Sequence, residues 1–296
     1  MALIILLGIF ILGAALGSFA VATVWRLRAL QLKADKTAGE HLNKAEVAFS
    51  DKFTQSFGLN DHSVCLHCDY RLRWFDLIPV ISWILLRGKC RKCHKNIGYS
   101  EIIAEIGMGL VFVLSYAFWP LGTDNITGIV TLVLWAIMLV LLCIHFFYDL
   151  KWQLLPDRIT TIFFAVAVVY WAISWATNPL ATTSSIAIDT AISFAVLPGF
   201  YGLLYLVSKG NWIGLGDVKM LIPMALVLMS WQNSFLLLFL SNFIGCLVLL
   251  PAMLSKKVAR GAHIPFGPFL IVGFVLVVLW GSAIMDVYLR NILFQP

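Results

Sequence analysis

Long apolar runs alternate with short polar connections along most of the chain. Eight runs are candidates for membrane-spanning helices, because about 20 consecutive apolar residues cross the hydrocarbon core of a bilayer. They cover residues 2–24, 103–120, 126–148, 159–177, 187–207, 218–231, 233–254 and 266–288, and the sixth run is the shortest. The pattern predicts an all-α polytopic membrane protein with about eight transmembrane helices.

One polar stretch interrupts this pattern. We predict a first transmembrane helix at 1–25, a loop domain at 26–100 and a membrane domain at 101–296. Within the loop, apolar residues at three- and four-residue spacing in 41–57 predict an amphipathic helix, which either packs on its own domain or lies on the membrane surface. The segment 76–86 is apolar but too short to span, so it either dips into the interface or braces the cysteine motifs beside it.

The composition favours a membrane over a large soluble core. The chain is 61% hydrophobic and 12% charged, against about 25% charged residues in soluble domains. Its net charge of +6 would suit nucleic acid, but the basic residues gather near 26–100, 149–158, 208–219 and 255–263, and the loops between these segments have none. Basic loops stay cytoplasmic. We therefore expect four cytoplasmic loops, both termini outside and no nucleic-acid partner.

Four cysteines in the loop form two C-x2-C pairs, Cys65 with Cys68 and Cys90 with Cys93. Two such pairs supply four thiolates, which close a tetrahedral zinc site. The expected cytoplasmic location disfavours disulfides, and no βαβ pattern surrounds either pair to suggest a thioredoxin-like redox site. Since four sulfur ligands leave no open position on the metal, we predict that the Zn²⁺ is structural.

Two aspartates lie at matching ends of predicted spans. Asp149 ends the third span, and Asp217 opens the sixth after Gly214 and Gly216, so topology alone places both at the cytoplasmic face. Ionisable groups in a membrane usually mark function. Two neighbouring carboxyl groups share a proton, and such a pair can activate water against a peptide carbonyl. The glycines would let the backbone turn and a substrate strand approach; a helix N-cap is the alternative role for Asp217.

Two further polar residues are candidates for a secondary site. Glu105 lies about one turn into the second span, where it could face the same aspartates. Lys219 follows Asp217 by two residues and is placed to snorkel to the interface. His145 precedes Asp149 by one turn, and we expect it to be a buried histidine with satisfied hydrogen bonds.

Together these motifs resemble the type IV prepilin peptidases, the bacterial leader peptidases that are also N-methyltransferases. The resemblance rests on the paired cysteine motifs, "LGSF" at 16–19, "DLKWQLLPD" at 149–157, "GLGD" at 214–217 and "IPFGPFL" at 264–270. It implies an intramembrane aspartic protease of the GxGD class in the bacterial inner membrane. In that family the catalytic acids match Asp149 and Asp217.

The family's substrates are prepilins of type IV pili or pseudopilins of type II secretion, whose short basic leader is cut just before a long apolar helix. Its members commonly then methylate the new N-terminal amine with S-adenosylmethionine, an activity associated with the zinc-bearing loop. The resemblance therefore implies structural zinc and S-adenosylmethionine as cofactors, and prepilins and the lipid bilayer as partners.

Two alternatives remain beside this interpretation. Three departures from the family's usual sequence lie in or beside the loop, including Glu101 and Ile102 where the family usually has Tyr-Pro. A peptidase that does not methylate is therefore the main alternative. A zinc-braced transporter subunit is the alternative outside proteases, but the sequence lacks the paired interrupted helices that many transporters carry in two related halves.

Overall fold

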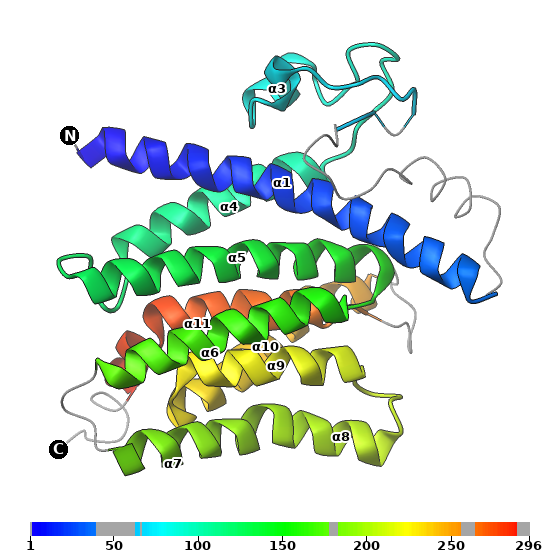
Figure 1. Ribbon diagram of the computed structural model, residues 1–296. Coiled ribbons are helices and arrows are strands. Elements are labelled where there is room, and N and C mark those ends of the chain that lie inside the picture. The colour runs from blue at the N-terminus through cyan, green and yellow to red at the C-terminus, as the bar shows by residue number, and fades with distance from the viewer. Residues whose placement is uncertain (1, 40–62, 66, 178–182, 256–263, 289–296) are drawn as a thin grey trace. The chain divides into compact units, whose positions relative to one another are not determined.

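A computed structural model describes residues 2–39, 63–65, 67–177, 183–255 and 264–288 (Figure 1). The chain folds into two compact units, Met1–Val113 and Leu114–Pro296. In the described part, every element of regular structure is helical apart from two isolated β-bridges. The amphipathic helix predicted at 41–57 lies outside the described residues.

The first unit contains two long helices and the loop domain between them. Its elements are α1 (Ala2–Thr37), the 3₁₀ turn η1 (Trp74–Leu77), α3 (Ile81–Leu85) and most of α4 (Ser100–Ala117). The predicted boundary between the first transmembrane helix, 1–25, and the loop domain falls inside α1, which continues to Thr37. Helices α1 and α4 pack closely, because a Cβ at Gly17 would lie only 2.5 Å from the backbone oxygen of Ala104. Small residues permit this approach between helices in membranes.

The second unit is a bundle of helices. It contains α5 (Ile126–Trp152), α6 (Asp157–Ala176), α7 (Thr183–Phe194), the π turn η2 (Ala195–Gly199), α8 (Phe200–Ser208), α9 (Leu215–Leu228), α10 (Trp231–Leu254) and α11 (Gly267–Tyr288). Side-chain caps start two of these helices: Asn125 accepts a hydrogen bond from the Gly128 N–H, and Ser230 accepts one from the Asn233 N–H. Figure 1 shows α5, α6, α9 and α11 running alongside one another.

Seven helical segments of the described residues are long and apolar enough to cross a membrane. They match seven of the eight predicted spans, and α7, η2 and α8 together supply one of them, Ser185–Ser208. The predicted sixth span corresponds to α9, which has 14 residues and therefore extends only about 21 Å at 1.5 Å per residue. The chain is thus a multi-pass membrane protein in which α9 is shorter than a full span.

Helix α9 belongs to the core of the second unit. Met220, Leu221 and Met224 on this helix are fully buried, so neighbouring helices enclose most of its length. Trp135 of α5 is also fully buried and packs against Phe274 of α11, with ring centroids 5.6 Å apart. Helix α11 packs against both α5 and α9, and these three helices carry Asp149, Asp217 and Gly267.

Candidate active site and metal centre

Asp149 lies in the last turns of α5 and is only 5% exposed. Its Oδ2 atom accepts a hydrogen bond of 3.0 Å from the backbone N–H of Gly267, the first residue of α11. A Cβ added at Gly267 would lie 2.7 Å from the same oxygen, so glycine alone leaves room for the carboxyl group. The start of α11 therefore positions Asp149 through its backbone.

Asp217 lies in the first turn of α9 and is half-buried. The backbone N–H of Gly214 donates a hydrogen bond to its carboxylate, and the charge of Asp149 acts on it electrostatically. The two acids, which are far apart in sequence, therefore lie near enough within the second unit for their charges to interact. A pair of carboxyl groups that share a proton requires such an approach.

One of the two glycines before Asp217, Gly216, permits the close approach of α9 to the turn that follows α5. Gly214 is the N-cap of α9 and has an ordinary extended conformation, with φ of −73°. A Cβ at Gly216 would lie 3.1 Å from the Cβ of Leu155 in the turn between α5 and α6. Gly216 therefore lets the start of α9 approach the end of α5, and the space beside it is filled by the protein's own Leu155.

The other polar residues have separate partners. Lys219 Nζ lies 2.8 Å from Asp157 Oδ1, an exposed ion pair that joins α9 to the start of α6. His145 is fully buried, and its ring nitrogens bond the Leu141 carbonyl and the Thr160 hydroxyl, as expected for a satisfied histidine. Glu105 belongs to the first unit, where its carboxylate accepts a 2.7 Å hydrogen bond from the Val80 N–H.

Sequence reasoning gave no role to two residues of the site. The first is Gly267, which lies within the "IPFGPFL" motif. The second is Tyr201 of α8, which interacts electrostatically with Asp217, stacks on Phe266 at 5.9 Å and accepts a hydrogen bond from Asn242. The available signal for Gly267 was its place between Pro265 and Pro268 at the start of a predicted membrane helix. Nothing in the sequence pointed to Tyr201.

The metal centre is built from two copies of the same turn in the first unit. In each copy the first cysteine's N–H bonds a carbonyl five residues later: Cys65 to Tyr70 and Cys90 to Lys95, both at 2.9 Å. Isolated β-bridges close both turns, Val64 with Arg71 and Lys89 with Asn96. The turns thereby present their paired thiols to one another.

The four cysteine sulfurs form a compact cluster. All four Sγ atoms lie within 4.8 Å of one another, and the pairs Cys65–Cys93 and Cys68–Cys90 are 3.9 Å apart. A tetrahedral zinc ion with Zn–S bonds of about 2.3 Å would require sulfurs about 3.8 Å apart. The donor set and its spacing therefore fit a four-thiolate metal site.

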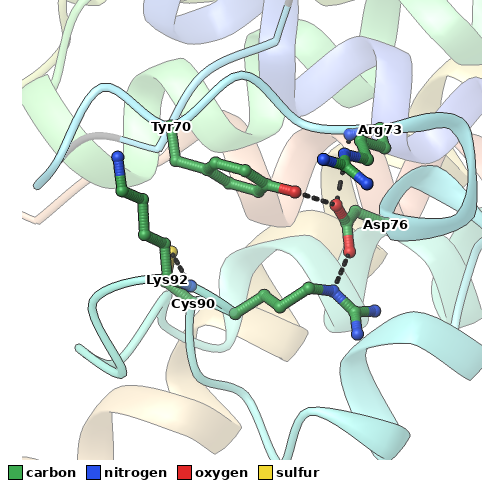
Figure 2. A network of polar contacts seen from close by, with 6 residues as sticks. Tyr70, Arg73, Asp76, Cys90 and Lys92 are labelled. Carbon is green, nitrogen blue, oxygen red and sulfur yellow. Dashed lines mark hydrogen bonds and ion pairs between the residues drawn. The ribbon is translucent and has the colours of Figure 1, made fainter.

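Asp76 links the two turns through a polar network (Figure 2). Its carboxylate accepts hydrogen bonds from the Tyr70 hydroxyl, the Arg73 N–H and Arg91 Nε, at 3.3, 3.1 and 2.8 Å. Burial alone would raise the pKa of Asp76, but Arg91 and these hydrogen bonds outweigh it and hold the pKa below its usual value. The carboxylate therefore stays charged and ties the second cysteine turn to the segment that follows the first.

Comparisons with known proteins match both units. Residues 11–119 match the bacterial peptidase A24 N-terminal domain, and residues 132–250 match the type IV leader peptidase family. Curated proteins named prepilin leader peptidase/N-methyltransferase are similar over most of the chain. The protein from Stutzerimonas stutzeri is 28% identical over 77% of this chain and 75% of its own length.

Two further relatives with the same name cover the chain more completely. The Pseudomonas putida protein is 27% identical over 95% of this chain and 91% of its own length. The protein from Dichelobacter nodosus is 28% identical over 95% of both chains. No solved structure matches. From the two domain matches and these relatives, we conclude that the chain belongs to the type IV leader peptidase family.

Proposed function

We propose that this protein cleaves the leader from prepilins or pseudopilins and then N-methylates the new N-terminus. The observation that supports the proteolytic part is the electrostatic interaction between Asp149 and Asp217 within the second unit. The names of its relatives, which join a prepilin leader peptidase to an N-methyltransferase, support both activities. The substrate class follows from the same names.

The chemistry of the pair is general acid–base catalysis. One carboxylate takes a proton from water as the hydroxyl oxygen adds to the scissile carbonyl carbon, and the other carboxyl group gives its proton to the carbonyl oxygen. When the C–N bond breaks, the proton taken from water passes to the leaving amine. The pair therefore needs one charged and one protonated member at the start of each cycle.

Backbone contacts act on both acids. A backbone N–H that donates to a carboxylate favours its charged form, and the first turn of a helix favours negative charge as well. Asp149 receives both effects from α11, and Asp217 receives them from the Gly214 N–H and the first turn of α9. We therefore assign one charge and one proton to the pair jointly. His145 on α5 is occupied by Leu141 and Thr160.

The orientation follows from the basic loops. Lys and Arg residues flank the ends of α5 and α9 that carry the two acids, and basic loops remain in the cytoplasm. The site would then lie at the cytoplasmic face of the bacterial inner membrane. A basic leader on the same side of the membrane could reach it while the apolar helix of the substrate stays in the bilayer.

We assign zinc to the four-cysteine cluster. Cys65, Cys68, Cys90 and Cys93 would hold it as thiolates, and a closed four-sulfur site contributes folding free energy rather than a reactive position. The metal would fix the two turns, and with them the network of Asp76. No step of the cleavage reaction passes through this site.

The methyl donor has a candidate pocket in the first unit. A cavity of about 600 Å³ lies between α1, the loop domain and α4, a size typical of small-molecule sites. Its lining includes the indole rings of Trp25 and Trp83 and the carboxyl groups of Glu101 and Glu105. These groups suit S-adenosylmethionine, whose sulfonium is a cation attracted by aromatic faces and carboxylates. When bound there, it would supply the methyl group.

The test is incubation of the purified protein in detergent with a model prepilin and S-adenosylmethionine, followed by mass spectrometry. We expect loss of the leader and a gain of one methyl group on the mature product. A product cut but not methylated would support the peptidase that lacks the second activity, and an intact precursor would contradict the proposal.

A further inference from the structure

The loop domain exposes an apolar surface around α3. Its members, which we call the α3 surface, are Trp74, Leu77, Ile81, Ile84 and Leu85, with exposed fractions of 78, 45, 55, 58 and 76%. Contiguous exposed apolar surface of this kind marks an interaction site in soluble proteins. Something apolar is therefore expected to cover it.

The short helix α3 is two-sided. Ile81, Ile84 and Leu85 point outward at helical spacing, whereas Ser82 and Leu86 line the cavity on the opposite side. An apolar stripe opposite an inward polar position is typical of helices that rest on another surface. The α3 surface is thus an ordered face of the domain. Leu77 also lines the cavity, and the other four members do not.

Hydrogen bonds fix the depth of α3 along the first membrane helix. The Val80 N–H donates to Glu105, whose carboxylate also bonds the Ser18 hydroxyl of α1. Ser18 lies about 12 Å along α1 from Arg26, the first basic residue of that helix. Since one leaflet contributes about 15 Å of hydrocarbon, the start of α3 lies at the depth of lipid tails.

The backbone of this segment is suited to such surroundings. Pro79 has no N–H group, the Val80 N–H is bonded to Glu105, and the N–H groups of Ser82, Ile84 and Leu86 donate to carbonyls within the segment. Peptide groups in contact with lipid must be satisfied by the protein, because the hydrocarbon offers no partners. These N–H groups of the α3 segment meet this condition.

The charge of the domain indicates which membrane surface it meets. Residues 63–99 carry seven basic side chains against two acidic ones, Asp69 and Asp76. Basic groups near anionic lipid headgroups contribute about 1 kcal/mol each. Arg87 and Lys89 follow α3 directly, where the chain returns from the apolar layer to the headgroups.

The geometry points to a lipid-binding role for the loop domain: the α3 surface inserts into the cytoplasmic leaflet, and the adjoining basic residues bind anionic headgroups. This role goes beyond the proposed reactions and does not depend on them. It would hold the four-cysteine cluster and the cavity against the membrane surface.

Photocrosslinking can identify what covers the α3 surface. A benzophenone amino acid replaces Leu85 in the full chain, which is reconstituted in vesicles of equal parts phosphatidylglycerol and phosphatidylcholine. We expect lipid adducts in mass spectra, with a yield several-fold above that of a probe at Lys33, an exposed residue of α1 beyond Arg26. Phosphatidylglycerol should be enriched among the adducts.

Other adducts would overturn the inference. Crosslinks from Leu85 to residues 40–62, to a second copy of the chain or to an added prepilin would each show that a protein segment covers this surface. Equal lipid yields at Leu85 and Lys33 would show that the α3 surface does not insert into the leaflet. A second probe at Trp74 decides the matter if the Leu85 variant fails to retain metal, and equal labelling of both lipids would remove the role of the basic residues.

Discussion

The two units of this protein build their polar sites in opposite ways. In the first unit, four thiols and the Asp76 network come from a stretch of about thirty residues, and local turns place them. In the second unit, Asp149, Asp217 and Gly267 come from three helices that are distant in sequence. The first site therefore depends on short-range geometry that suits a metal, and the second on the packing of a membrane bundle.

This difference predicts that the two sites can be damaged separately. The largest effect is expected from Asp149→Asn or Asp217→Asn, each of which removes a proton-transfer group. Cleavage of a model prepilin should fall by about 10²–10⁴-fold, while metal content and methylation of a pre-cut peptide stay at the parent level. Normal cleavage by both single variants would rule out the acid pair.

Loss of the metal should mainly affect the first unit and the methylation assigned to it. In the variant with Cys65→Ser and Cys68→Ser, two of the four ligands are gone, so we expect about one equivalent of zinc per chain to be lost. Methylation should fall more than cleavage, because the cavity lies beside the metal turns. Elemental analysis and the two activity assays measure this, with Cys143→Ser as the control. Full zinc retention would show that the cluster is not the metal site.

The close contact between Gly267 and Asp149 can be tested by the substitution Gly267→Ala, which adds one methyl group. Gly267→Ala places a Cβ 2.7 Å from the carboxylate oxygen, and displacing a catalytic group by about 1 Å can cost about 10²-fold in kcat. We expect kcat to fall with little change in KM. The acidic limb of the cleavage profile should also move to higher pH, because the displaced carboxylate loses a donor that favours its charge.

The matched control for that variant is Gly245→Ala. Gly245 is buried on α10 and faces Phe269 in the first turn of α11, but its added Cβ would be 3.5 Å away, an ordinary contact. The Gly245→Ala variant should cleave a model prepilin at the parent's rate. Equal losses in both variants, without a shift of the pH profile, would mean that Gly267 matters only for packing.

A smaller effect is expected from Asp76→Asn in the first unit. The amide keeps an oxygen acceptor for Arg73 and Tyr70 but loses the charge that holds Arg91, at a cost of roughly 1 kcal/mol. Zinc should leave the variant at a lower chelator concentration. Because the folded pKa of Asp76 is depressed, its contribution is complete above the unfolded value and is lost only as the pH falls through the folded one. The difference between the chelator concentrations at which parent and variant lose zinc should therefore be constant from about pH 6 to 8.

The smallest effect is expected from the ion pair that joins α9 to the start of α6, two residues beyond Asp217. Lys219 and Asp157 are 41 and 71% exposed, and pairs of this kind contribute about 0.2–1 kcal/mol. Lys219→Ala should lower cleavage by less than about fivefold, with a smaller difference at high salt. A loss as large as that of the aspartate variants would instead give Lys219 a direct part in the reaction.

The same contrast explains what could be predicted from the sequence. The spacing of Cys65, Cys68, Cys90 and Cys93 was sufficient to predict the cluster, because ligands on short turns are set by local geometry. Topology predicted that Asp149 and Asp217 lie near each other, and their electrostatic interaction agrees with this. The role of Gly267 could not be predicted, because its contribution is a backbone N–H that every residue except proline possesses. The shortness of α9 was predicted, because the apolar run 218–231 and the helix Leu215–Leu228 are equally short.

The shortness of α9 has a consequence for hydrolysis. A helix of about 21 Å leaves part of a layer about 30 Å thick unspanned, so irregular chain at one end of α9 enters membrane depth. Peptide groups in that stretch need solvent or neighbouring protein to complete their hydrogen bonds. Gly214 is exposed, so water that satisfies peptide groups beside it would also be the reactant consumed in each turnover.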